Sequence, residues 1–123
     1  MKKIFLLTAF IIISIFNIKA FAEECNVNIY LFYASWNANS QKAQNVTTNV
    51  AGTYKKNVGY KAFDVDSEET YKFIKSNNLN MPKYLPSVMV VDKRKRVLST
   101  TEYRNQDEPR LKNLLDENIL PNL

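Results

Sequence analysis

Residues 27–33, Val-Asn-Ile-Tyr-Leu-Phe-Tyr, form a nearly unbroken run of aliphatic and aromatic side chains. A strand with one face in water alternates apolar and polar residues, whereas a continuous apolar run is typical of a strand covered on both faces. The pattern therefore predicts a buried strand over residues 26–34, in the middle of an α/β sheet.

The next three elements are a helix, a strand and a short helix, predicted from helical spacing, a second apolar run and a capping serine. From Asn39 onward, apolar residues recur every three or four positions, which predicts a helix with Asn37 or Asn39 at its N-cap. Residues 60–65 predict a second strand. Ser67 then caps a short helix, which residues 77–82 end. The apolar positions that we assign to the inner faces of these two helices are Ala43, Val46, Val50 and Tyr54 in the first, and Tyr71, Phe73 and Ile74 in the second.

The last third of the chain predicts a hairpin and a final helix. Residues 87–91 and 96–100 are short apolar runs on either side of a charged turn, and the helix opens at residues 107–109. The order is β-α-β-α-β-β-α. A helical crossover makes the first two strands parallel, and the hairpin is antiparallel. We predict one α/β domain over residues 23–123, a mixed sheet with helices on both faces. The last helix has an apolar stripe at Leu111, Leu114, Leu115 and Ile119.

Residues 1–22 have the three zones of a secretory signal peptide. Lys2 and Lys3 precede an apolar run over residues 4–16, and residues 20–22 read Ala-Phe-Ala, a small-x-small cleavage pattern. We expect cleavage after Ala22 and a secreted or periplasmic protein, with an uncleaved N-terminal anchor as the alternative. In either case we expect contact with the membrane only through this segment, transiently as a signal peptide or permanently as an anchor. Cleavage also lowers the formal charge from +5 to +2.

The contents of the chain exclude several kinds of chemistry. One Cys and no His exclude an intramolecular disulfide, a CxxC pair, and mechanisms that need a histidine base. The pattern shows no set of metal ligands and no cofactor motif, so we expect neither. Asp64 and Asp66 could form a weak cation site, but structural roles are favoured. Residues 93–96 form a basic run that is typical of a solvated turn, and with the low mature charge they predict no nucleic-acid partner.

Two segments resemble the thioredoxin family. Residues 31–42, Leu-Phe-Tyr-Ala-Ser-Trp-Asn-Ala-Asn-Ser-Gln-Lys, are similar to the strand-to-helix active-site segment, which usually reads F-x-A-x-W-C-G-P-C-K. Residues 85–87, Leu-Pro-Ser, resemble the cis-proline signature of the family. The resemblance covers residues 26–120 and lacks the usual extra N-terminal strand and helix. It implies a thioredoxin-like fold with Pro86 in cis beside the start of the first helix.

The resemblance also shows what is missing. The two cysteine positions of the family align with Asn37 and Ser40, and the position of its buried aspartate aligns with Leu31. Asn37 cannot ionise, and a serine hydroxyl is too weakly acidic to replace a thiolate. We therefore expect no dithiol oxidoreductase activity.

The retained frame predicts instead that a protein or an extended peptide binds at the face of Trp36, Asn37, Ser40 and Pro86. Each residue also has a structural alternative. Asn37 and Ser40 could cap the helix, Trp36 could pack over the edge of the domain, and Pro86 could simply shape a turn. The domain could also have no ligand at this face.

Cys25 offers a second functional hypothesis. It lies before the first strand, whereas the active-site face of the family follows that strand. Eight extended residues span roughly 26 Å, so Cys25 cannot reach Asn37 or Ser40 within one domain. The alternative function is thus a monothiol or partner-assisted oxidoreductase that uses Cys25 alone.

Overall fold

The apolar run over residues 27–33 forms an interior strand of a mixed sheet. The structure is a computed structural model that describes residues 25–104 and 108–123. The four strands are β1 (Val27–Tyr33), β2 (Val58–Asp64), β3 (Ser87–Asp92) and β4 (Val97–Glu102). Their order is β2-β1-β3-β4, with β1 and β2 parallel and the other two pairs antiparallel. The predicted topology and element order are confirmed.

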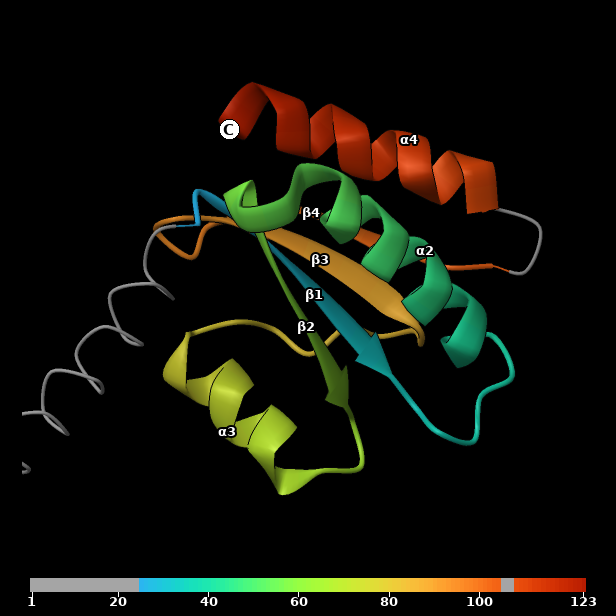
Figure 1. The fold of residues 1–123 in the computed structure, drawn as a ribbon. Coiled ribbons are helices and arrows are strands. Elements are labelled where there is room, and N and C mark those ends of the chain that lie inside the picture. The colour runs from blue at the N-terminus through green and yellow to red at the C-terminus, as the bar shows by residue number, and fades with distance from the viewer. Residues whose placement is uncertain (1–24, 105–107) are drawn as a thin grey trace, which may run out of the picture.

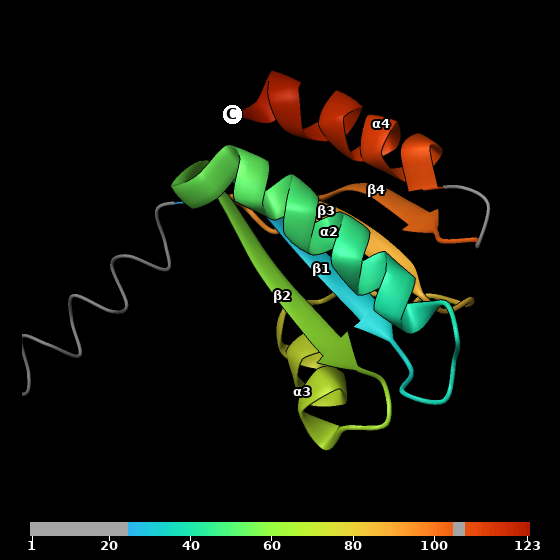
Figure 2. The ribbon, with the colours of Figure 1, turned by 45° about the vertical axis from the view of Figure 1, so that its right-hand side comes forward.

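Helices cover both faces of the sheet. Helices α2 (Ser40–Tyr54) and α4 (Glu108–Ile119) lie over one face, and α3 (Glu68–Ser76) lies over the other (Figures 1 and 2). The short 3-10 turns η1 (Lys55–Asn57) and η2 (Leu120–Asn122) follow α2 and α4. Along β1, Ile29 and Leu31 pack toward α2 and α4, whereas Tyr30 and Phe32 pack toward α3. This alternation explains why β1 carries apolar side chains at almost every position.

A polar contact ties the two helices of one face together. The Tyr54 hydroxyl of α2 donates to Asp116 Oδ1 of α4 at 2.7 Å. Burial, together with this hydrogen bond and the negative charge of Asp116, raises the pKa of Tyr54 to about 12. The phenol therefore stays protonated and remains a donor throughout the physiological pH range.

The inner face of α3 corrects one sequence prediction. Tyr71 is 58% exposed rather than buried, whereas Ile74 is buried as expected and Phe73 is partly buried. The position toward the sheet is taken by Thr70, whose hydroxyl donates to the carbonyl of Asp64. The small polar residue lies inside because it satisfies a carbonyl at the end of β2, which the apolar pattern cannot reveal.

The second strand begins earlier than its hydrophobic pattern suggests. The structure starts β2 at Val58 rather than at residue 60, directly after η1. Val58 and Gly59 pair with Val27 and Asn28 of β1, and Val58 is buried. Pairing with a neighbouring strand extends β2 past the boundary that a glycine indicates in the sequence alone.

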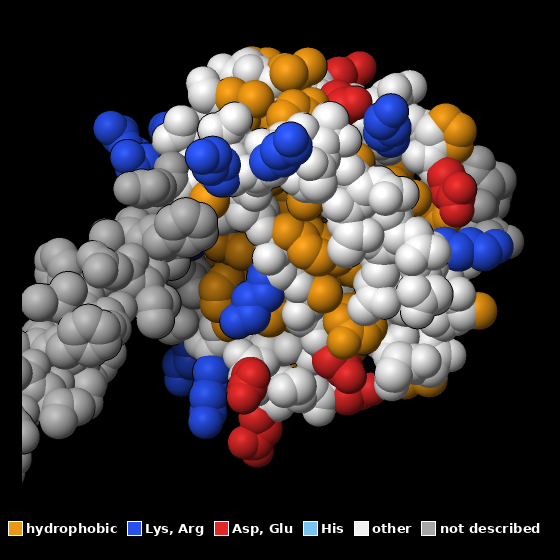
Figure 3. Space-filling view, viewed as in Figure 1, with side chains coloured by type: hydrophobic (Ala, Val, Ile, Leu, Met, Phe, Trp, Pro, Cys, Tyr) orange, Lys and Arg blue, Asp and Glu red, His pale blue; other side chains and the backbone are white. Residues whose placement is uncertain are grey.

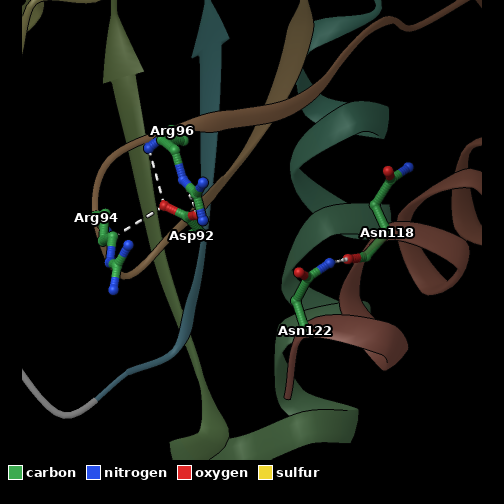
Figure 4. Close-up of polar contacts among 5 residues, drawn as sticks. All are labelled: Asp92, Arg94, Arg96, Asn118 and Asn122. Atoms are coloured by element: carbon green, nitrogen blue, oxygen red, sulfur yellow. Dashed lines mark hydrogen bonds and ion pairs between the residues drawn. The ribbon is translucent and has the colours of Figure 1, made fainter.

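Side-chain hydrogen bonds stabilise the turn between β3 and β4 and the C-terminal turn η2 (Figure 4). In the turn between β3 and β4, Asp92 Oδ1 accepts the N–H groups of Arg94 and Arg96, both at 2.9 Å. Asp92 Oδ2 accepts from Arg96 Nε at 2.7 Å. In η2, Asn122 Nδ2 donates to the carbonyl of Asn118 at 2.7 Å, which fixes the last residues to the end of α4.

The turn contacts make stability depend on the charge of Asp92. The N–H of Arg96, helped by the Arg96 guanidinium and the N–H of Arg94, lowers the pKa of Asp92 although burial opposes this. The contribution of Asp92 to the free energy of unfolding is therefore complete above the unfolded pKa of about 3.9 and is lost as the pH falls toward the lower folded pKa.

We expect Asp92→Asn to lower the urea midpoint at neutral pH and to flatten its fall below about pH 4. Urea unfolding at several pH values measures both effects. Asp66→Asn, which changes an exposed carboxylate, is the matched control. If the urea midpoint of Asp92→Asn fell below pH 4 as steeply as that of the native chain, this role of Asp92 would be contradicted.

The predicted signal peptide, residues 1–22, lies outside the described residues. In the portion of the chain that the structure describes, no helix combines the length and the apolar character needed to cross a membrane.

Candidate functional site

The candidate site lies where β1 ends and α2 begins, beside the loop that leads into β3. After β1 the chain turns twice, with the N–H of Asn37 donating to the carbonyl of Ala34 at 3.0 Å and the N–H of Ser40 donating to that of Asn37 at 3.1 Å. The Leu85–Pro86 peptide bond is cis, as the resemblance implied. The site therefore joins two segments almost 50 residues apart in sequence, which the hydrogen bond between Asn37 and Leu85 connects directly.

Asn37 connects these segments through both ends of its amide. Its Oδ1 accepts the N–H of Asn39 at 2.9 Å, and its Nδ2 donates to the carbonyl of Leu85 at 3.0 Å. One side chain thus fixes the turn before α2 and holds the loop at the cis-proline.

The cap of α2 is shared between the two asparagines that the sequence put forward. Asn39 is the N-cap residue by position, but its own side chain makes no capping bond. The side chain of Asn37 accepts the N–H of Asn39 instead, two residues further along the chain. Asparagine and aspartate both favour this local side-chain turn. The donation from Asn37 Nδ2 to the Leu85 carbonyl is what requires an amide, since an ionised carboxylate has no hydrogen to donate.

Ser40 is part of the interior rather than of the surface. It is 4% exposed, and its hydroxyl donates to the carbonyl of Ala34 at 2.7 Å. The Ser40 side chain therefore satisfies a backbone acceptor at the end of β1, and no part of its hydroxyl faces a ligand.

Two exposed aromatic side chains flank the Asn37–Leu85 hydrogen bond along the chain. Trp36 precedes Asn37 and is 71% exposed, and Tyr84 precedes Leu85 and is 63% exposed. Pro86 itself is buried, and its carbonyl accepts the N–H of Tyr103 at 2.9 Å. Sequence reasoning selected Trp36 but missed Tyr84. Tyr84 could have been found from its position directly before residues 85–87, the segment that resembles the proline signature. The hydrogen bond from Asn37 to Leu85 brings this segment to the site.

Leu31 and Cys25 lie away from this face. Leu31 is fully buried in the core under α2 and α4, so the position that the resemblance gives to a buried carboxylate holds an alkyl side chain. Cys25 precedes β1, at the opposite end of that strand from the site. Its thiol is free and partly exposed, and Sγ donates to the carbonyl of Lys56 at 3.7 Å.

The site therefore offers aromatic surface and a rigid hydrogen-bonded loop. Trp36, Asn37, Ser40 and Pro86 carry no group that ionises near neutral pH. Within the described residues, no three Cys, Asp or Glu side chains come together in a way that could hold a metal ion.

Comparison by sequence finds neither a matching family model nor a matching curated protein. Comparison by structure does find relatives in shape. The germline-specific thioredoxin Deadhead of Drosophila melanogaster is 17% identical, with a TM-score of 0.61 over 85% of this chain and 92% of its own. The oxidised thioredoxin of Plasmodium falciparum is 17% identical, with a TM-score of 0.60 over 84% and 90%. Thioredoxin O2 of Arabidopsis thaliana is 18% identical, with a TM-score of 0.58 over 85% and 86%. These similarities are similarities of fold.

Proposed function

Because the chain has a thioredoxin-like fold, we propose that it is an exported binding domain without dithiol oxidoreductase activity. Its ligand is an extended segment of a protein, bound where Trp36 and Tyr84 are exposed. Asn37 and the buried Ser40 and Pro86 support this face from within. Export depends on the signal-like residues 1–22. The fold alone does not carry a function, so the proposal depends on the chemistry of this site.

The observation that carries the proposal is the bonding of Asn37 and Ser40. Both side chains stand where the family aligns its thiols, and both make short hydrogen bonds to backbone groups of the same chain. Thiol exchange needs a reactive thiolate and a second thiol to resolve the mixed disulfide. An amide and a buried hydroxyl supply neither, but they hold the loop in one conformation. A loop ordered before binding reduces the entropy lost when a partner binds.

Recognition at this face depends mainly on Trp36 and Tyr84. Exposed aromatic side chains on ordered loops provide a large contact area, and tryptophan and tyrosine are enriched among the residues that dominate binding energy. The carbonyl of Leu85 already accepts a bond from Asn37, which limits how much an incoming strand gains from that backbone group. The aromatic pair therefore gives this face its affinity.

The test is binding of the mature chain to an array of unstructured peptides, followed by titration of the best binder. We expect Trp36→Ala and Tyr84→Ala each to weaken binding by about 30-fold, equivalent to about 2 kcal/mol. Tyr71→Ala is the matched control, since Tyr71 is also an exposed aromatic but lies on α3. Equal affinity in all three variants would place the ligand elsewhere.

A second assay separates this proposal from the monothiol alternative. Cys25 is a partly exposed free thiol, which is the observation in favour of that alternative. Turnover of a disulfide substrate by the purified mature chain, abolished by Cys25→Ser, would overturn the redox-inactive proposal. A thiol that resists alkylation in the native protein would rule out the alternative.

A further inference from the structure

One edge of the sheet has backbone groups that no strand pairs. β2 is the outermost strand on its side, and within residues 25–104 and 108–123 its only partner is β1. The N–H of Val65, just after β2, donates to the carbonyl of Tyr33 in β1. By the alternation along a strand, the backbone N–H and carbonyl groups of Gly59, Lys61 and Phe63 also point toward β1. Successive residues of a strand point their backbone groups to opposite sides. Tyr60 and Ala62 therefore direct their N–H and carbonyl groups away from the sheet.

The opposite edge of the sheet is protected, and the β2 edge is not. β4 has a register shift opposite Val90 and Val91 and carries exposed Glu102 at its end, next to Arg104. Bulges and charged side chains are the usual means of blocking an edge strand. In contrast, β2 pairs with β1 in regular register over seven residues, and Lys61 is its single exposed charged side chain.

The surface beside β2 carries apolar groups and both signs of charge. Figure 3 shows this face, with hydrophobic side chains between α2 and α3 around a basic side chain and with acidic side chains along the rim below. A shallow cavity of about 230 Å³ lies along the strand, and Lys61, Phe63, Asp64, Glu69 and Phe73 are among its lining residues. Lys61 Nζ lies 5.1 Å from the centre of the Phe63 ring. The basic and acidic groups of one surface can thus face each other when the surface meets its own copy.

We propose that β2 pairs with β2 of a second copy of this chain, antiparallel, so that two sheets join into one. A two-fold axis normal to the sheet requires that outward-facing residues meet outward-facing residues. With the axis at Ala62, Ala62 meets Ala62 of the second copy, and the Tyr60 carbonyl meets the outward N–H of that copy's Asp64. The Asp64 carbonyl takes no part in this pairing, because it already accepts the Ser67 N–H and the Thr70 hydroxyl. Lys61 then lies opposite Phe63 of the second copy, on the surface that Glu69 of that copy also lines.

This register is favoured over its neighbour by charge. With the axis at Lys61, the two lysines would face each other directly, and like charges opposite each other destabilise a strand pair. The register at Ala62 separates the lysines and repeats, between copies, the Lys61–Phe63 contact already present within one chain. A two-fold interface needs this self-complementarity, which is why the second copy is the partner proposed.

The first test follows amide hydrogen exchange against protein concentration, with sedimentation to measure mass. We expect the Ala62 and Asp64 amides, which find carbonyl partners in this register, to slow by about tenfold or more as the dimer forms. Thr100 and Glu102 are the internal control, because their backbone groups also point outward, but from the β4 edge. A monomer at all concentrations, with Ala62 and Asp64 exchanging as fast as Thr100 and Glu102, would overturn the proposal.

Two sets of variants test the same contact. Ala62→Pro removes an outward N–H and is expected to abolish the dimer, whereas Thr100→Pro makes the same change at the β4 edge and should leave it intact. Lys61→Glu is expected to weaken the dimer about tenfold, and addition of Glu69→Lys should restore it. A folded Ala62→Pro chain that dimerises like the native chain, or a Lys61→Glu chain with unchanged affinity, would each contradict this interface.

Discussion

Replacing both Asn37 and Ser40 by cysteine, in a Cys25→Ser background, is expected to create a dithiol that oxidises to a disulfide. The two positions are three residues apart in a turn, with the N–H of Ser40 bonded to the carbonyl of Asn37. Residues so placed bring their α-carbons within about 7 Å, which is within the reach of a disulfide. The first position also lies just before α2, where the helix N-terminus stabilises a thiolate and lowers a thiol pKa to about 7 or below.

The expected result is turnover of a disulfide substrate by the double variant, supported by dithiothreitol as reductant, and none by the Cys25→Ser chain. The new activity should be accompanied by a lower free energy of unfolding in the reduced form. Loss of the Ser40 hydroxyl removes one of the two hydrogen bonds to the Ala34 carbonyl, which keeps that of the Asn37 N–H, at a cost of about 0.5–1.5 kcal/mol. Insulin reduction and a thiol titration of the oxidised chain measure the two chemical outcomes.

Each single variant, Asn37→Cys or Ser40→Cys, is the control, since one thiol can form a mixed disulfide but cannot resolve it. A double variant that keeps both thiols free under air would show that Asn37 and Ser40 do not have dithiol geometry. That result would remove the main argument for calling this face a former redox site.

Phe32→Ala is expected to cost about 3–5 kcal/mol, a large part of the 5–15 kcal/mol that stabilises a typical domain. Phe32 is fully buried in β1 and stacks on Phe63 of β2, with ring centres 5.4 Å apart. Phe63 in turn stacks on Phe73 of α3 at 4.3 Å. Removal of one ring opens a cavity beneath the only helix on that face among the described residues, so the packing of α3 is expected to loosen first.

Urea unfolding followed by circular dichroism measures this loss. Tyr71→Ala removes an aromatic side chain from α3 at an exposed position and should change the free energy of unfolding by no more than about 0.5 kcal/mol. A cost below about 1 kcal/mol for Phe32→Ala would mean that the aromatic cluster does not hold α3 on the sheet.

The order of elements could be predicted because the relevant signals are local. Continuous apolar runs gave β1 and β3, and the helical spacing of Ala43 and Val50 gave α2. The parallel pairing of β1 and β2 followed from the helix between them, since parallel strands need a long crossover connection and a helix commonly supplies it. The sequence did not reveal that Thr70 rather than Tyr71 packs inward, because that choice depends on a carbonyl at the end of β2.

The site was predicted in part, through its resemblance to a known pattern. Trp36, Asn37, Ser40 and Pro86 were identified, and the structure brings their two segments together through the Asn37–Leu85 bond. Their separate roles were not predictable. Whether Ser40 faces a ligand or the interior depends on where α2 lies relative to the end of β1, and the structure buries it.

The sequence by itself determined the α/β class and the strand and helix order, because periodicity records these directly. Through the resemblance to the thioredoxin family it also indicated that the two aligned positions carry no thiol. Only the tertiary structure decided what replaced the thiols: an amide that holds the cis-proline loop and a hydroxyl that satisfies the end of β1. It also decided that Tyr84 is exposed in the loop that Asn37 bonds, and that β2 lies at an edge of the sheet. The physical reason is the same throughout, since hydrogen-bond partners and strand neighbours far apart in sequence are set by packing, and a local pattern carries no record of them.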